Sequence, residues 1–395
     1  MRDVYIAGVG MTRFGRHGER GIKSLVAEAV GLAQADADFA DDRYEQPMVF
    51  YSNVFGGTLQ GQESVRGQQA LRETTLVGGT VVNVENACAS GSTAFNLAWL
   101  TVASGRADRA IIIGAEKLDV PDKRLAFDAL HGALDQDLMD EIKAEYSNED
   151  SQSVFMAIYA RYAREFMEAS GATQEDFARV CVKNQAAGLL NDKAQYGGTL
   201  TIEEVIGARH IAGPITLPMC APMSDGAAAV ILSAGEDLRP GSGPKVRVLA
   251  SEVQAGLAGG NRELVPRTAR SAFEAAGIGP RDIDVIECHD AAAPGEMIAL
   301  DDVSLGELGD TVELMRSGAT ALGGSLPVNP SGGLECRGHP FGATGLAQII
   351  EVVDQLKGRC GARQVEGAMI GLTENAGGYI GPDAAAATIT ILGRD

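Results

Sequence analysis

The strongest constraint on the fold is an alternation of strand and helix patterns that the chain uses twice. A buried β-rich run at 4–9 is followed by apolar residues at helical spacing over 24–37, and similar pairs continue to about residue 115. A second series begins with a strand pattern at 246–250 and a helix pattern at 265–276. Alternation at this spacing predicts a mostly parallel sheet with helices on both faces. We therefore expect an α/β fold built from two similar halves.

The alternation is interrupted between the two series. Residues 118–219 are acidic, rich in helix formers and poor in strand signals, so we expect a helical domain inserted in the first half. The Pro- and Gly-rich stretch 238–244 is the best candidate linker. These features predict an N-terminal half (1–117 and 220–238), the inserted domain (118–219) and a C-terminal half (245–395).

Charge and cysteine spacing argue against several classes of function. With 53 acidic against 33 basic residues, the net charge is −20, so nucleic acid or an anionic membrane would be repelled. The six cysteines are too far apart for a metal knuckle or a disulfide framework. No signal-peptide pattern opens the sequence, and no apolar run reaches the ~18 residues of a membrane span. We expect a cytoplasmic protein that binds no nucleic acid, membrane or metal.

Cys88 is the first candidate for chemistry. It lies in the segment NACASGS, directly after a buried strand pattern and at the start of a long helix pattern. A helix N-terminus stabilises a thiolate, and the backbone N–H of such a cysteine can point at a developing oxyanion. The alternative is a small apolar cysteine packed at a strand–helix turn, and this segment alone does not decide between the two.

Two of the five histidines lie in loop patterns. His289, in ECHDA, follows a strand pattern, and His339 lies in a glycine-dense loop that opens a helix. A third polar turn carries Glu374 and ends in glycines whose N–H groups can approach a ligand. A lone loop histidine is often structural or solvated, so these segments carry weight only in combination.

Taken together, the segments resemble the thiolase superfamily, and within it the sterol-carrier-protein-type thiolases. The resemblance rests on NACASGSTA, MSDGAAAV at 223–230, HDA at 289–291, GGLECRGHPFGATG at 332–345 and the final ENAGG turn at 374–378. It implies a thiolase-like five-layer αβαβα core of two similar halves, a loop domain inserted in the first half and, usually, a homodimer.

The resemblance also implies roles for individual residues. Cys88 matches the acylated nucleophile, and His339 matches the base that takes the thiol proton. His289 matches the histidine that holds the thioester oxygen of the second substrate. The N–H of Gly377, together with that of Cys88, matches the oxyanion hole. A Cys–His pair with backbone donors suits acyl transfer through tetrahedral intermediates.

The sequence departs from this branch of the family at two places. The branch usually has His-Asp-Cys-Phe where this chain has Ala291 and Ala292 after the His-Asp pair. The missing cysteine would be the acid/base at the α-carbon. We do not expect Cys288 to replace it, because neighbouring residues on a strand point to opposite faces. The branch also has a histidine where this chain has Glu374, and a buried carboxyl could be the replacement proton shuttle.

Coenzyme A is the expected co-substrate, with no permanently bound cofactor. Because the chain is acidic overall, the phosphates of coenzyme A need local cations on the protein. The candidates are Lys183, Lys193 and Arg209. Ser331 and Gly332 are candidates for packing along the pantetheine. Each of these residues could instead be an ordinary surface or loop residue.

These observations favour a CoA-dependent acyltransferase that cleaves a β-ketoacyl-CoA through a Cys88 acyl-enzyme. Two alanines beside His289 remove bulk, which predicts a pocket for a bulky, aromatic or branched acyl group. The pattern looks closest to 2-benzoylsuccinyl-CoA thiolases, which work with a small zinc-ribbon/OB-fold partner protein.

The alternatives are a retro-aldolase on β-hydroxyacyl-CoA, a biosynthetic acetyl-CoA C-acetyltransferase and a non-catalytic acyl-CoA-binding subunit. The acidic stretch 135–150 is a possible partner contact or a solvated helix face.

Overall fold

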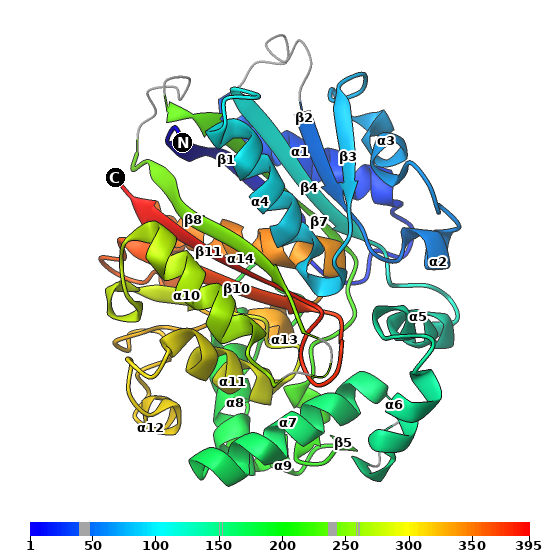
Figure 1. The fold of residues 1–395 in the computed structure, drawn as a ribbon, viewed down its shortest axis with the longest axis vertical. Coiled ribbons are helices and arrows are strands. Elements are labelled where there is room, and N and C mark those ends of the chain that lie inside the picture. The colour runs from blue at the N-terminus through cyan, green and yellow to red at the C-terminus, as the bar shows by residue number, and fades with distance from the viewer. Residues whose placement is uncertain (39–47, 150, 152, 236–242, 258, 260) are drawn as a thin grey trace.

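The computed structural model describes all residues except 39–47, 150, 152, 236–242, 258 and 260 (Figure 1). Its N-terminal half holds five strands in the order β3-β2-β4-β7-β1. Their bounds are β1 Val4–Met11, β2 Met48–Ser52, β3 Thr80–Val84, β4 Arg109–Glu116 and β7 Gly226–Ala234. β2 is parallel to β3 and β4, whereas β7 is antiparallel to β4 and β1.

The C-terminal half repeats this topology. Its strands are β8 Val246–Ala255, β9 Val285–Glu287, β10 Ile370–Gly377 and β11 Ala386–Arg394, in the order β8-β11-β10-β9. A parallel bridge between Ile286 and Val328 adds the equivalent of the fifth strand beyond β9. The order and direction of the strands in the C-terminal half then match those in the N-terminal half, as expected for two similar halves. The bridge between Tyr5 and Arg247 joins β1 to β8, so the two halves form one continuous sheet of nine strands.

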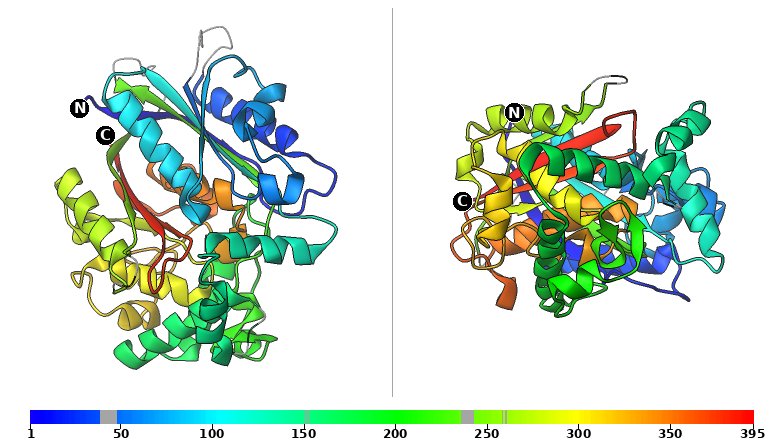
Figure 2. Two further views of the ribbon diagram at one scale, coloured as in Figure 1. Left: turned by 45° about the vertical axis from the view of Figure 1, so that its right-hand side comes forward. Right: turned by 90° about the horizontal axis from the view of Figure 1, so that it is seen from below.

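Helices cover both halves and fill the space between them. α4 (Ser90–Ala103) packs on α14 (Phe341–Leu356) between the strands of the two halves, whereas α1 (Ile22–Asp36) covers the outer face of the N-terminal half (Figure 2, left). On β4, Ile112 faces the core around α4 and α14, and its neighbour Ile111 faces α1. α10 (Leu264–Ala276) and α11 (Ala293–Ser304) cover the outer face of the C-terminal half. This arrangement is the predicted αβαβα layering. The remaining helices of the two halves are α2 Gly56–Gln60, α3 Arg66–Ala70, α12 Thr311–Arg316 and α13 Gly333–Arg337.

The segment between β4 and β7 is mainly helical, as its composition indicates. Its helices are α5 Lys123–Leu130, α6 Met139–Glu145, α7 Val154–Ser170, α8 Gln174–Leu189 and α9 Ile202–Ile206, and they gather below the strands in Figure 1. The side chain of Ser153 caps α7, and Thr173 forms a capping box with Asp176 at the start of α8. A short hairpin, β5 His210–Ala212 with β6 Ile215–Thr216, is the strand content that the sequence pattern did not predict.

The exact domain limits stay a prediction, and the expected linker 238–244 lies largely outside the described residues. In the part of the chain that the structure describes, no helix is both long and apolar enough to span a bilayer.

Candidate active site

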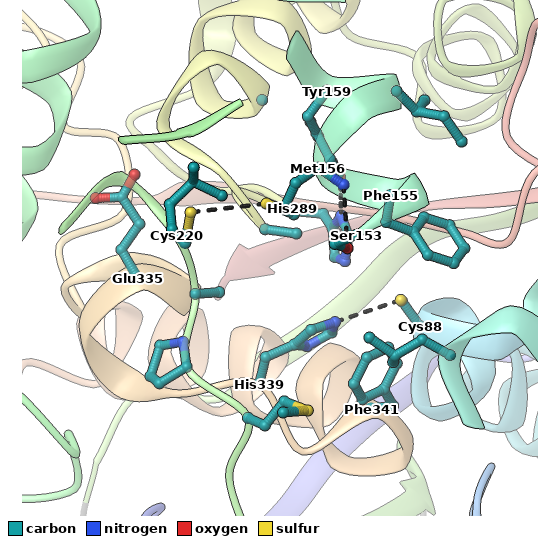
Figure 3. A pocket seen from close by; sticks show the side chains of 18 of the residues that line it. Cys88, Ser153, Phe155, Met156, Tyr159, Cys220, His289, Glu335, His339 and Phe341 are labelled. Atoms are coloured by element: carbon teal, nitrogen blue, oxygen red, sulfur yellow. Dashed lines mark hydrogen bonds between the residues drawn. The ribbon is translucent and has the colours of Figure 1, made fainter. Parts of the chain in front are cut away.

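Equivalent turns in the two halves bring Cys88 and His339 together. Cys88 lies in a single 3₁₀ turn, Ala87–Ala89, between β3 and α4, and His339 lies two residues before α14, whose N-cap is Pro340. Since α4 and α14 occupy corresponding places in the two halves and pack on each other, the residues at their N-termini meet. Cys88 Sγ lies 3.3 Å from His339 Nε2, and Figure 3 shows the two side chains directed at one another.

The hydrogen bonds around His339 fix which ring nitrogen accepts the thiol proton. Nδ1 lies 2.7 Å from Thr344 Oγ1, and this hydroxyl donates to the carbonyl oxygen of Pro340 at 3.2 Å. The hydroxyl proton is therefore in use, so Thr344 accepts from Nδ1–H. Nε2 is left with a lone pair directed at Cys88. The ring of Phe341 packs against the imidazole, with 4.0 Å between centroids.

Burial keeps both partners neutral in the resting site. It raises the pKa of Cys88 to about 12, against the lowering effect of the backbone N–H groups of Cys88 and Gly378. Burial also holds the pKa of His339 well below its usual range, and the neighbouring His289 and Arg337 lower it further. The expectation of a thiolate stabilised at a helix N-terminus is therefore wrong for the resting site. Proton transfer to His339 must accompany attack on a substrate.

The turn at Gly377 packs directly on the backbone of Cys88. A Cβ on Gly377 would lie 2.7 Å from the Cys88 nitrogen and 2.6 Å from the Asn86 oxygen, so the position excludes any side chain. The backbone N–H that faces the Cys88 sulfur is that of Gly378, one residue beyond the predicted donor. An N–H that faces the sulfur stabilises a thiolate, whereas the oxyanion forms on the substrate, so the Gly377 N–H stays the predicted second oxyanion donor beside that of Cys88.

His289 lies beside the Cys88–His339 pair, two residues after the end of β9. Its ring centroid is 5.2 Å from that of His339, and the ligand atoms of Cys88, His289 and His339 all lie within 4.8 Å of one another. Burial lowers the pKa of His289 to about 4, so its imidazole is neutral near pH 7. Nδ1 lies 3.4 Å from the hydroxyl of Tyr159, and Nε2 is buried with no hydrogen-bond partner among the described residues. The three ligand atoms are close enough to hold a metal ion, and the expected absence of a metal stays a prediction.

Glu374 on β10 completes the group. Its Oε2 accepts a hydrogen bond from the backbone N–H of His289 at 2.9 Å, and its side chain lines the same cavity. Burial raises the pKa of Glu374 to about 7. A carboxyl of this pKa can both take and give a proton near neutral pH. Cys288, by contrast, packs under β8 and β11, away from the cavity, and so does not lie where the missing cysteine would act.

The cavity has a volume of about 1230 Å³, and its wall near Cys88 is largely apolar. Ala291 lines it, together with Phe155, Ile158 and other apolar side chains of the inserted segment. Ala292, however, is fully buried in an apolar core formed mainly by the inserted segment, and its backbone forms a bridge with Cys220. The expected void beside His289 is therefore open only at Ala291, because the inserted segment fills the space at Ala292.

Of the expected CoA contacts, Arg209 lies at the cavity and Lys183 does not. Arg209 is exposed and lines the cavity, as does Arg16, which the sequence reasoning missed. The Lys183 ammonium is buried, lies 2.9 Å from a carboxylate oxygen of Glu296, and donates to the backbone oxygen of Val328 at 2.6 Å. A buried ammonium needs such partners, so Lys183 holds the fold together and has no donor left for a phosphate.

Ser331 and Gly332 also lie in the protein interior, away from the cavity. The Ser331 hydroxyl donates to Glu287 Oε2 at 2.8 Å and is fully buried. Gly332 packs on Gly188, where a Cβ would lie 2.8 Å from its Cα. Neither residue reaches the cavity wall, so the expectation that they pack along pantetheine is wrong. Lys193 lines a second, smaller cavity at another place.

Sequence reasoning missed several residues of the site. Tyr159 is part of an amphipathic helix pattern that gives no sign of a catalytic neighbour. Thr344 lies within the segment GHPFGATG, five residues after His339, which is the only signal that could have singled it out. Glu335 also lines the cavity, and neither of its carboxylate oxygens has a hydrogen-bond partner among the described residues.

Comparisons with known proteins identify the family of this chain. The thiolase N-terminal domain model matches residues 4–236, and the thiolase C-terminal domain-like model matches residues 261–394. An acetyl-CoA acetyltransferase of Methanothermobacter thermautotrophicus is 38% identical, over 96% of this chain and 97% of its own length. The benzoylsuccinyl-CoA thiolase subunit BbsB of Thauera aromatica is 34% identical over 92% of each chain. Sterol carrier protein 2 of Bos taurus is 32% identical over 95% of this chain and 70% of its own length.

Among solved structures, an Ltp2-ChsH2(DUF35) aldolase superposes with a TM-score of 0.80, covering 100% of this chain and 98% of the other, at 21% identity. That likeness concerns the fold. The family models cover both halves, and the relatives span nearly the whole chain. The chain is therefore a member of the thiolase family, an acyltransferase that acts on acyl-CoA.

Proposed function

We propose that this protein is a thiolase that cleaves a β-ketoacyl-CoA with a bulky acyl group through an acyl-enzyme on Cys88. The observation that carries the proposal is the 3.3 Å approach of Cys88 Sγ to His339 Nε2 in a cavity that His289 and Glu374 also line.

In the first half-reaction, His339 Nε2 takes the Cys88 proton while the sulfur attacks the β-keto carbon. The N–H groups of Cys88 and Gly377 stabilise the oxyanion. Its collapse breaks the Cα–Cβ bond and leaves the acyl group on Cys88. The departing enolate is held at its thioester oxygen by His289, and the neutral carboxyl of Glu374 protonates its α-carbon. A shorter acyl-CoA is released, with His339 now cationic and Glu374 now a carboxylate.

In the second half-reaction, the Glu374 carboxylate takes the proton of the CoA thiol. The CoA sulfur attacks the acyl-enzyme carbonyl, and the same two N–H groups stabilise the second oxyanion. The Cys88 thiolate leaves and regains its proton from His339. Both residues then return to their starting protonation states, so the cycle needs no other proton donor.

The bulky acyl group is supported by the volume of the cavity, its apolar wall and the small side chain of Ala291. The name of the Thauera aromatica relative, benzoylsuccinyl-CoA thiolase, agrees with such a substrate. A biosynthetic acetyl-CoA acetyltransferase is the second candidate, because the archaeal relative of that name is 38% identical to this chain. The retained Cys88–His339 pair supports transfer over the retro-aldolase and over a non-catalytic acyl-CoA-binding subunit.

Intact-mass spectrometry after incubation with a panel of acyl-CoA thioesters tests the proposal. We expect an acyl adduct on the wild-type protein that is absent from Cys88→Ser. We also expect the highest kcat/KM with aromatic or branched β-ketoacyl-CoA. A wild-type protein without adduct would overturn the acyl-enzyme, and a preference for acetoacetyl-CoA would favour the acetyltransferase.

We further propose a cytoplasmic homodimer that works with a small zinc-ribbon/OB-fold protein. Support for the small partner comes from the word "subunit" in the name of one relative and from the two-protein name of the Ltp2-ChsH2(DUF35) structure. Co-expression with such a protein and co-purification is the test. The partner is excluded if the chain reaches full activity alone and retains no small protein.

A further inference from the structure

The two ring nitrogens of His289 have different surroundings. Nδ1 lies 3.4 Å from the hydroxyl of Tyr159, whereas the buried Nε2 has no partner in the described part of the chain. Figure 3 places His289 between Tyr159 on one side and the Cys88–His339 pair on the other. Since the two nitrogens lie on opposite sides of the ring, Nε2 points away from Tyr159 and is the nitrogen available to a substrate in the cavity.

The role of His289 depends on which of its two ring nitrogens carries the proton. Burial lowers its pKa to about 4, so near pH 7 the ring is neutral and carries a single proton, on either Nδ1 or Nε2. A thioester oxygen accepts only from an N–H. The role proposed for His289 therefore requires the proton on Nε2, and something must hold Nδ1 as an acceptor.

The Tyr159 hydroxyl is suited to that task. Burial raises its pKa far above the usual value, so it remains an O–H donor. Its ring is held in place on α7, where the Cε1 atom lies 3.2 Å from the position that a Cβ on Gly295 would occupy. Donation from this hydroxyl to Nδ1 places the ring proton on Nε2, where it can bind a substrate oxygen, whereas the other tautomer offers that oxygen only a lone pair.

We infer that Tyr159 is a positioning residue that donates its O–H to Nδ1 of His289 and so holds the Nε2–H tautomer that binds the thioester oxygen. The inference rests on the proposed function and adds a residue of the inserted segment to the site. The inference predicts that loss of the Tyr159 hydroxyl impairs one partial reaction and leaves another unchanged. Acylation of Cys88 by a simple acyl-CoA expels the CoA thiolate and forms no enolate, so it is independent of Tyr159, whereas cleavage of a β-ketoacyl-CoA, which expels an enolate held by His289, is not.

Tyr146→Phe is the control for Tyr159→Phe. Tyr146 also belongs to the inserted segment, but its hydroxyl is hydrogen-bonded to that of Tyr379 at 2.8 Å, and its side chain does not line the cavity. We expect Tyr159→Phe to lower kcat for carbon–carbon bond cleavage by about 10²-fold, the loss typical of one removed oxyanion donor. Cys88 acylation by a simple acyl-CoA should stay near the wild-type rate. Tyr146→Phe should change neither measurement.

A double-mutant cycle separates tautomer control from a general structural effect. The amide of His289→Asn donates without any tautomer, so Tyr159→Phe should have no further effect in that background. An equal loss in both backgrounds would overturn the inference.

¹⁵N NMR of histidine-labelled protein supplies a readout that does not depend on activity. We expect the His289 ring to carry its proton on Nε2 in the wild type and to lose this preference in Tyr159→Phe. An unchanged tautomer in Tyr159→Phe contradicts the inference even if activity falls. If the wild type forms no acyl adduct, the proposed function fails while this measurement still tests the role of Tyr159.

Discussion

Glu374 shows how strongly burial alone changes a side chain in this site. Its carboxyl has one hydrogen bond, from the His289 N–H, and no ion pair is formed with it among the described residues. Burial raises its pKa from 4.5 to about 7, with a smaller contribution from Asp302. The same loss of solvent keeps Cys88 a thiol and His339 an uncharged imidazole. The site therefore rests neutral and develops charge only with substrate.

This shift predicts the pH dependence of a partial reaction. The carboxylate form of Glu374 is the base that removes an α-proton from acetyl-CoA, so exchange of the methyl protons in D₂O should rise as pH increases through about 7. Glu374→Gln should lose this exchange by at least about 10²-fold. NMR of acetyl-CoA between pH 5.5 and 8.5 measures the rate. Exchange that is unchanged in Glu374→Gln, while Cys88 acylation persists, would assign the base to another group.

At the scale of residues, the sequence was informative where a motif carried the chemistry. The pairing of Cys88 with His339 followed from the motifs NACASG and GHPFGATG. Lys183 was misassigned because its side-chain type does not reveal that Glu296 lies beside it in the fold. Tyr159 was missed because helical periodicity shows which face is covered but not which partner covers it.

At the scale of elements, α8 is tied to the loop that carries His289. Lys183 and Asn184 on α8 both reach Glu296 on α11, and Asn184 also donates to Asp290, the neighbour of His289. The Asp290 carboxylate also accepts from the backbone N–H of Leu334 on α13, five residues before His339. One buried polar network thus links the inserted segment to the loop that carries His289 and to the short helix that precedes His339.

This network predicts different defects for two basic residues. Lys183→Met leaves Glu296 buried without its cation, so the free energy of unfolding should fall by about 3–5 kcal/mol. Arg209→Ala removes an exposed cation at the cavity, so KM for CoA should rise roughly fivefold at unchanged stability. Urea unfolding and steady-state kinetics distinguish the two. A stable Lys183→Met with a raised KM would restore Lys183 as a CoA contact.

The elements themselves were largely predictable from strand and helix patterns, and the exceptions have local causes. Residues 67–76 have a helical pattern in the sequence, but α3 ends at Ala70 and a 3₁₀ turn follows. The Thr74 hydroxyl there donates to the Leu71 carbonyl and accepts from the Leu76 N–H, which gives the backbone an alternative to the helix. The void expected at Ala292 is filled by the inserted segment, a contact that only tertiary packing decides.

At the scale of the whole molecule, β3 leaves one edge of the long sheet without a partner strand in the described chain. Leu97 and Leu100 on the neighbouring helix α4 are 37% and 39% exposed, one turn apart, and Val77 before β3 is 58% exposed. An unpaired edge beside exposed apolar side chains is the usual setting for pairing with another chain. We propose this face for the homodimer.

Negative charges placed on the exposed face of α4 beside β3 should separate the subunits of the proposed dimer. We expect Leu97→Glu combined with Leu100→Glu to convert a dimer to a folded monomer, because two carboxylates on each side would be buried unpaired. Leu189→Glu, at a 61% exposed position on α8, is the control and should stay dimeric. Light scattering after size exclusion gives the mass. A double variant that remains dimeric would place the interface elsewhere.

The thiol and its base are 251 residues apart in the chain. At the ribosome, where about 5–20 residues are added each second, Cys88 emerges roughly ten seconds to a minute before His339. During that interval the sulfur has no proton acceptor and remains an ordinary cysteine, so an unfinished polypeptide cannot capture acyl groups from the cell's thioester pool. Synthesis itself thus delays reactivity until the second half has folded against the first.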